Sequence, residues 1–157
     1  HATKKRAGAT KSTIAEEKLY RTDDGKIYTP STQIMGCLVN ASKNFKIQGK
    51  GKATYSKLIG SSIEIMPDAL VHTNQEWKEF TVSAVNPMTK GRMMVTRPMM
   101  EKWGFEFMVK FNEDDIPIEV LKNILDYAGQ YVGIGDWRPE KKGKYGKFIV
   151  AKFEEDE

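Results

Sequence analysis

The sequence predicts an α+β domain in which two helices lie on one face of an antiparallel sheet. Three observations lead to this class. Apolar residues recur at helical spacing in residues 32–46 and again in residues 118–131. Apolar and polar residues alternate over parts of residues 78–111, between these segments, as in half-buried strands. The resulting order of helix, strands, helix and strand is typical of helices packed on an antiparallel sheet.

The elements before the first long helix are short. Residues 1–13 are polar and basic, so we expect a flexible arm. Residues 13–19 predict a short helix, and Asp24-Gly25 predicts a tight turn between two short extended pieces. An alternative function for the arm is phosphate binding through its basic residues Lys4, Lys5, Arg6 and Lys11.

The first long helix is expected to follow Pro30, with Ser31 or Thr32 capping its free amides, and to end near Lys46. Residues 47–53 are glycine-rich and basic, which predicts a loop. A short helix or turn at 54–60 and a short strand at 61–66 should follow. The apolar face of the long helix consists of Ile34, Leu38, Ala41 and Phe45.

The middle of the chain predicts a β-meander. Residues 78–85 and 91–97 give two strands, and Pro98 ends the second strand or places it at a sheet edge. The clearest alternation predicts a third strand through Trp103, Phe105, Phe107, Val109 and Phe111.

The last elements are a helix from Ile118 to about Tyr131, a glycine-rich loop, and a strand from Lys147 to Phe153. We therefore expect a flexible arm at 1–13, one domain at 14–153 and a frayed acidic tail at 154–157.

Charge is unevenly distributed along the chain. Its 157 residues fit one domain, and the net charge of +4 is mild. Four windows, at 1–11, 43–57, 90–102 and 138–152, nevertheless hold 19 of the 25 lysines and arginines. Only Glu101 and Glu140 are acidic within these windows. The sequence thus predicts local basic patches under a nearly balanced total.

Several classes are excluded by composition. A single cysteine, Cys37, rules out an intrachain disulfide framework and favours a cytoplasmic setting. No apolar run approaches the roughly 18 residues of a membrane span, so we expect no membrane partner. The 10% aromatic and 29% charged residues indicate a globular domain rather than a disordered chain.

The most unusual segment is residues 132–148, VGIGDWRPEKKGKYGKF. Glycines allow close backbone approach, lysines and amides bind phosphate, and aromatic rings stack on bases, so the segment favours nucleic-acid binding. An equally good interpretation is a solvated loop with Trp137 tucked into the core. The candidate binding residues are Gly133, Gly135, Trp137, Arg138, Lys141, Lys142, Gly143, Lys144, Tyr145, Gly146 and Lys147.

This segment, read as GIGDWRPEKKGKYGKFIV, resembles the glycine-rich loop of the RAMP superfamily, the repeat-associated proteins of CRISPR effector complexes. More specifically, the chain resembles short single-domain homologues carried by phages and prophages. The resemblance extends over most of residues 18–153 through KLYRTDDGKIYTPSTQIMGCLVNASKNFK, MMVTRPMMEKWGFEFMVKF and IPIEVLKNILDYAGQYVGIGDWRP.

The resemblance implies an RRM-like (ferredoxin-like) core, RNA or single-stranded nucleic acid held along its backbone, and self-association into an oligomer or filament. Homologues begin with a strand that ends in a segment like Pro-Leu-Leu-Met-His. His1 would be its last residue, which places that first strand outside this chain. Outside the loop, the resemblance and the basic stretch add the binding candidates Arg97, Lys43, Lys46, Lys50 and Lys52.

The basic stretch at 43–57 has a second interpretation. It begins at a helix C-terminus, where the helix dipole favours cations, so part of it is structural. Tyr55 lies among its lysines, which slightly favours a nucleic-acid surface.

Catalysis, a metal site and a cofactor are not expected. Cys37 belongs near the apolar face of a helix and predicts a buried thiol. Two histidines and one cysteine do not fit a common zinc pattern. The acids at 113–115 suit a helix N-terminus better than a divalent ion, and a structural role is favoured for Asp136.

The sequence therefore predicts a non-catalytic protein that binds RNA or single-stranded nucleic acid through a basic glycine-rich loop. The alternative is a phage-encoded interaction or assembly factor that mimics or inhibits a CRISPR backbone subunit. Its contacts would come from sheet edges and the methionine-rich hairpin, around which Met93, Met94, Met99, Met100 and Met108 cluster.

Overall fold

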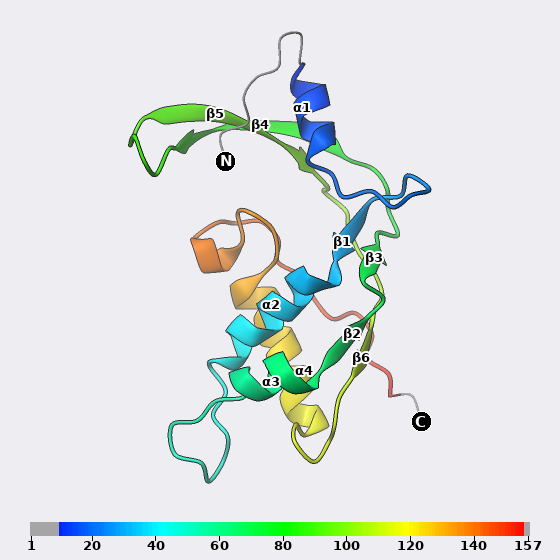
Figure 1. Ribbon diagram of the computed structural model, residues 1–157, viewed down its shortest axis with the longest axis vertical. Coiled ribbons are helices and arrows are strands. Elements are labelled where there is room, and N and C mark those ends of the chain that lie inside the picture. The colour runs from blue at the N-terminus through cyan, green and yellow to red at the C-terminus, as the bar shows by residue number, and fades with distance from the viewer. Residues whose placement is uncertain (1–9, 156–157) are drawn as a thin grey trace. The chain divides into compact units, whose positions relative to one another are not determined.

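The computed structural model describes residues 10–155 and has an α+β fold (Figure 1). Its helices are α1 (Lys11–Glu17), α2 (Ser31–Ser42), α3 (Ser56–Ser62) and α4 (Ile118–Tyr127), with a π-helical turn at Ala128–Val132 and a 3₁₀ turn at Pro139–Lys141. Its strands are β1 (Tyr28–Pro30), β2 (Glu64–Met66), β3 (Ala69–Val71), β4 (Lys78–Val85), β5 (Arg92–Met99) and β6 (Met108–Lys110). These strands form three two-stranded sheets, β1 with β3, β2 with β6, and β4 with β5.

The described chain divides into two compact units. Of the described residues, unit 1 contains 10–29 and 71–106, and unit 2 contains 30–70 and 107–155. Each unit therefore consists of two segments that are far apart in the sequence.

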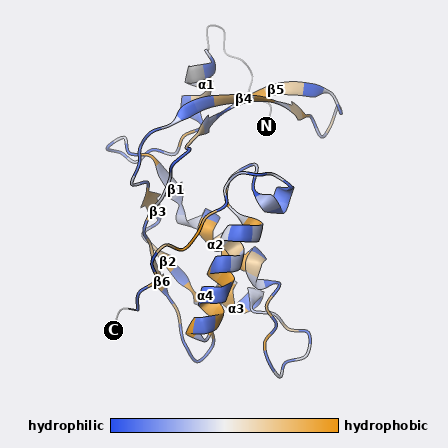
Figure 2. Cartoon of the chain, turned by 180° about the vertical axis from the view of Figure 1, so that it is seen from behind, coloured by the Kyte–Doolittle hydropathy of each residue, from blue (hydrophilic) through white to orange (hydrophobic). Residues whose placement is uncertain are grey.

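Unit 2 holds most of the core. Ile34 and Leu38 of α2 and Ile124 of α4 are at most 1% exposed. The β2–β6 pair lies in the same unit, with Ile65 opposite Val109 in an antiparallel register. Figure 2 shows hydrophobic and hydrophilic bands along α4, as expected of a helix with one buried face.

Unit 1 is built on the β4–β5 hairpin, which has a continuous antiparallel register from Lys78 opposite Met99 to Val85 opposite Arg92. The Thr81 and Thr96 hydroxyls lie 2.9 Å apart across the two strands. The Lys18 ammonium, just after α1, donates to the Thr96 carbonyl oxygen at 2.7 Å. These contacts connect the short first helix to the hairpin.

The prediction of a third meander strand at residues 103–111 is wrong over most of that segment. Only Met108–Lys110 is a strand, and it pairs with β2 rather than with β5. The rings of Trp103 and Phe105 instead lie 6.4 Å and 5.7 Å from the buried His72 ring. These ring contacts and the hydrogen bond from Thr73 N to the Gly104 carbonyl oxygen replace ladder pairing in this segment.

The expected strand at 147–153 is also absent, because this segment has no ladder partner among the described residues. Its backbone is fixed near its start by a 3.0 Å hydrogen bond from Phe148 N to the Gly129 carbonyl oxygen. Further along, the Lys122 ammonium of α4 lies 5.0 Å from the centre of the Phe153 ring.

Several local expectations need correction. Neither Ser31 nor Thr32 caps α2: Pro30 is the N-cap residue, and the Ser31 amide donates to the Asp68 carbonyl oxygen. The helix ends at Ser42 rather than Lys46. Lys11 begins α1 instead of belonging to a flexible arm, while residues 1–9 and 156–157 lie outside the described part.

Other expectations are confirmed. The turn at Asp24-Gly25 has Gly25 at φ 83°, and Arg21 and Ile27 are bridged across it. The loop after α2 and the short helix α3 also occur where the sequence predicts them. Cys37 is buried, with 4% of its surface exposed.

Candidate nucleic-acid interface

The glycine-rich segment Gly133–Lys147, called the glycine loop below, folds back on itself. The Ile134 amide donates to the Gly146 carbonyl oxygen at 3.1 Å, and the Tyr145 amide donates to the Trp137 carbonyl oxygen at 2.9 Å. The Gly143 amide closes the tip by donating to the Arg138 carbonyl oxygen at 3.0 Å. The two arms of the loop are thus tied together by their own backbone.

Three glycines are required by these close approaches. A Cβ atom on Gly146 would lie 1.8 Å from the Ile134 carbonyl oxygen, and one on Gly143 would lie 2.0 Å from the Trp137 carbonyl oxygen. A Cβ atom on Gly133 would lie 2.7 Å from Pro139. The space beside these glycines is therefore occupied by the protein's own chain.

Gly135 differs from these three glycines. It is exposed, has φ +89° and would place a Cβ atom within 4 Å of nothing. Among the four glycines expected to admit a ligand backbone, Gly135 is the one that faces open space.

The aromatic residues of the loop form a pair. The Trp137 and Tyr145 rings are stacked, with centres 5.9 Å apart and planes 13° apart, and both residues are half-buried. Trp137 is therefore neither exposed nor fully buried. The Lys144 ammonium lies 5.5 Å from the centre of the Tyr145 ring, which places positive charge at this aromatic pair.

Most of the loop's basic side chains are exposed. Within residues 10–155, no carboxylate pairs with any of Lys141, Lys142, Lys144 and Lys147, and all four are exposed. Arg138 is used internally, because its guanidinium bonds to Glu140 at 3.0 Å and to the Gly135 carbonyl oxygen at 3.0 Å. The lysines, rather than Arg138, are available to a ligand.

A cavity of about 290 Å³ lies between the glycine loop and α2. Polar side chains of Thr32, Gln33 and Asn40 line it from the helix. The loop side contains Gly133, Ile134, Gly135, Asp136, Arg138 and Glu140. The open glycine at 135 therefore borders a polar cleft.

Cys37 lines the same cleft but is a poor nucleophile. Burial, with the Glu140 carboxylate adding to the effect, raises the pKa of the Cys37 thiol to about 12. Its Sγ donates a weak hydrogen bond to the Ala128 carbonyl oxygen at 3.6 Å. The neutral thiol is thus part of the packing between α2 and the π-helical turn.

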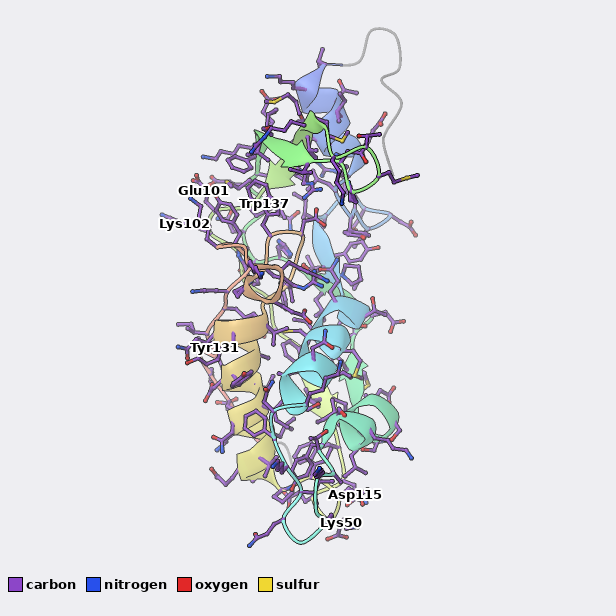
Figure 3. All side chains as sticks on the ribbon, turned by 90° about the vertical axis from the view of Figure 1, so that its left-hand side faces the viewer. Lys50, Glu101, Lys102, Asp115, Tyr131 and Trp137 are labelled. Carbon is purple, nitrogen blue, oxygen red and sulfur yellow. The ribbon has the colours of Figure 1, made fainter. Side chains whose placement is uncertain are left out.

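The second basic group lies at the other end of unit 2. Lys46, Lys50 and Lys52 are exposed, and Lys43 donates to the Asn40 side chain at 3.1 Å. Figure 3 shows Lys50 beyond one end of α4 and Trp137 beyond the other, with Tyr131 between them. The structure therefore does not bring the lysines at 43–52 and the glycine loop into one cluster.

Two further residues of the sequence analysis have other positions. Arg97 is half-buried in β5 of unit 1, opposite Phe80. Tyr55 is 8% exposed, so its ring belongs to the core and not to a binding surface.

Sequence reasoning missed the α2 side of the cleft. Thr32, Gln33 and Asn40 interrupt the apolar pattern of this helix, and Gly36 lies among them. Residues 32, 36 and 40 are spaced four apart and share one face of the helix. That polar face was a usable signal, but its partner could be found only from the path of the loop.

No group of three or more potential metal-ligating side chains is found within residues 10–155. No helix in the described ranges is both long enough and apolar enough to cross a membrane. No family model matches the sequence, and no curated protein or solved structure matches it either.

Proposed function

We propose that the protein is a non-catalytic, cytoplasmic protein that binds RNA or single-stranded nucleic acid, and that the glycine loop holds the backbone of the strand. One observation carries this proposal. A loop closed by its own backbone exposes four lysines without acidic partners in the described chain, next to a stacked Trp–Tyr pair. Such a preformed basic and aromatic surface suits a flexible polyanion, because little of the loop must be ordered on binding.

The parts of the loop have separate roles in this proposal. Phosphates lie against the ammonium groups of Lys141, Lys142 and Lys144, and the backbone passes over Gly135, where a Cβ atom would have no neighbour within 4 Å. Bases stack against the half-buried Trp137–Tyr145 pair. The amides of Gln33 and Asn40 in the cleft meet the polar groups of one nucleoside.

The test is a fluorescence anisotropy titration with labelled U20 RNA and dT20 DNA at 50 and 300 mM NaCl. Wild-type affinity should fall steeply with salt, because bound lysines release counterions. Replacing Lys141, Lys142 and Lys144 together by Ala should reduce the slope of log affinity against log salt by about 2. Absence of binding at 50 mM NaCl to both strands overturns the proposal.

A matched control separates local from global charge. Lys26, Lys78 and Lys152 are paired with Asp24, Glu101 and Glu154, respectively. Replacing these three by Ala removes the same charge and should leave the salt slope nearly unchanged. Equal loss in both triple variants would show that the glycine loop is not the binding surface.

We also propose the RAMP relationship, an RRM-like core and assembly along the bound strand. The antiparallel β2–β6 pair and the two helices α2 and α4 in the same unit are compatible with part of a ferredoxin-like arrangement. The test of assembly is light scattering with strands of increasing length, in which the number of bound copies should rise with length.

A protein-interaction role is the second candidate, because the β4–β5 hairpin exposes apolar side chains at its tip. Val85, Met88 and Met94 are 54%, 92% and 66% exposed. Oligomers that form without nucleic acid, ignore salt and dissociate when these three residues are replaced by Ser would favour this role.

A further inference from the structure

The aromatic side chains Phe45, Tyr127 and Tyr131, called the ring ladder below, form a second feature of unit 2. The Phe45 and Tyr127 rings meet edge to face, with centres 5.6 Å apart and planes 86° apart. The Tyr127 and Tyr131 rings follow at 4.7 Å. The three rings thus make one continuous series from the segment after α2 to the π-helical turn.

The ring ladder is accessible from solvent. Tyr131 is 54% exposed, and Phe45 and Tyr127 are half-buried. Tyr55, by contrast, is buried, and its amide donates to the Phe45 carbonyl oxygen at 3.0 Å. The backbone of Phe45 is thus held by the amide of a buried residue, while Tyr131 is exposed and the other two rings are partly accessible to a ligand.

The ring ladder connects the two basic groups along the chain. Phe45 lies between Lys43 and Lys46, and Tyr131 lies two residues before Gly133. In Figure 3, Tyr131 lies on the route from Trp137 towards the end of unit 2 that contains Lys50. Along the chain, Tyr127 and Tyr131 thus lie between the exposed lysines at 46–52 and those of the glycine loop, and Phe45 directly precedes Lys46.

Charge indicates which ligand fits this surface. The segment 43–57 contains five lysines and no acid. On α4, Asp126 is adjacent to Tyr127, but successive helical residues point about 100° apart, so the two side chains leave the helix in different directions. Aromatic rings flanked by cations at both ends match a chain of alternating bases and phosphates.

We propose that the ring ladder is a base-stacking track, along which a single strand runs from the glycine loop to the lysines at 46–52. This inference rests on the proposed function and extends the binding site to Phe45, Tyr127 and Tyr131. A strand of about five nucleotides contacts only the glycine loop, whereas one of about fifteen occupies both basic groups and the ladder.

The experiment compares U5 and U15 RNA in anisotropy titrations at 50 mM NaCl. Tyr131→Ala should weaken U15 binding about tenfold and leave U5 binding within about twofold, because stacking on one aromatic ring is lost. Tyr131→Phe, which keeps the ring, should bind U15 like the wild type. If Tyr131→Ala binds U15 as tightly as the wild type does, the base-stacking track is overturned. This holds even where the triple replacement of Lys141, Lys142 and Lys144 supports binding by the glycine loop.

A measurement on the wild-type chain does not depend on how the variants fold. Tetranitromethane nitrates exposed tyrosines, and peptide mapping by mass spectrometry gives the extent at each position. Bound U15 should reduce the nitration of Tyr131 at least fivefold. The nitration of Tyr20, which is 50% exposed and lies in unit 1, should not change. Equal nitration of Tyr131 with and without U15 contradicts the track, and failure of the wild type to bind either strand overturns both proposals.

Discussion

At the scale of single residues, the glycines of the glycine loop have two different roles. Gly133, Gly143 and Gly146 each leave room for another part of the same loop, whereas Gly135 faces open space. The sequence could identify the loop and its glycine content but not this division. A glycine needed for a backbone approach looks the same in a sequence as one that admits a ligand.

Substitution by alanine separates these two roles. Gly146 and Gly135 both have positive φ, 79° and 89°, so alanine is strained at either position. At Gly146 the new Cβ atom also collides with the Ile134 carbonyl oxygen. We expect Gly146→Ala to lower the free energy of unfolding by roughly 1–3 kcal/mol more than Gly135→Ala.

Urea denaturation followed by circular dichroism measures this difference, with Gly135→Ala as the control for backbone strain alone. Equal losses in the two variants would mean that the loop backbone shifts to admit the extra methyl group. If Gly135→Ala weakens RNA binding and Gly146→Ala does not, the result supports the proposal that the ligand occupies the open space beside Gly135.

At the scale of elements, the local periodicity predicted helices better than strand pairing. The helices α2 and α4 form where apolar residues recur at helical spacing, because such a stripe is buried wherever it packs. The alternation of apolar and polar residues at 103–111 does not by itself produce a strand, since a strand also needs a partner to pair with. Trp103 and Phe105 pack beside His72, and only Met108–Lys110 is paired.

The buried ring of His72 should make the free energy of unfolding depend on pH. Its Nε2 atom lies 2.7 Å from the Thr29 hydroxyl, and burial lowers the pKa of the ring below its ordinary value of 6.5. Below pH 6.5 the unfolded chain therefore takes up a proton that the folded chain resists. The free energy of unfolding should fall with decreasing pH, by at most about 1.4 kcal/mol per pH unit from this group.

Urea denaturation between pH 5 and 8 tests this dependence, and His72→Gln is the comparison. The variant lacks the titrating ring, so its stability should vary less with pH below 6.5 than that of the wild type. Parallel profiles for the two proteins would exclude His72 as the source.

At the scale of the whole molecule, the two units differ in how much core they contain. Eight of the nine largest fully buried side chains in the described chain belong to unit 2, and Ile27 is the one in unit 1. Burial of apolar side chains is the main source of local stability, so resistance to opening should follow the same division.

Hydrogen exchange measured by NMR should show this difference directly. We expect the amides of α2 and α4 to exchange slowest, and those of the β4–β5 hairpin to exchange faster although they are also hydrogen-bonded. Slowest exchange in the hairpin would contradict this order. The division into units was not predictable from periodicity, because each unit combines two segments that are separated by 41 residues in unit 1 and by 36 in unit 2.

The buried thiol of Cys37 is a natural probe of local opening. It is the single cysteine of the chain, it borders the cleft between α2 and the glycine loop, and its high pKa suppresses the reactive thiolate. A thiol-specific alkylating reagent should therefore modify Cys37 mainly in states in which this region is open. The rate of that reaction follows the population of such states, without a label or a substitution, and a ligand bound in the cleft should lower it.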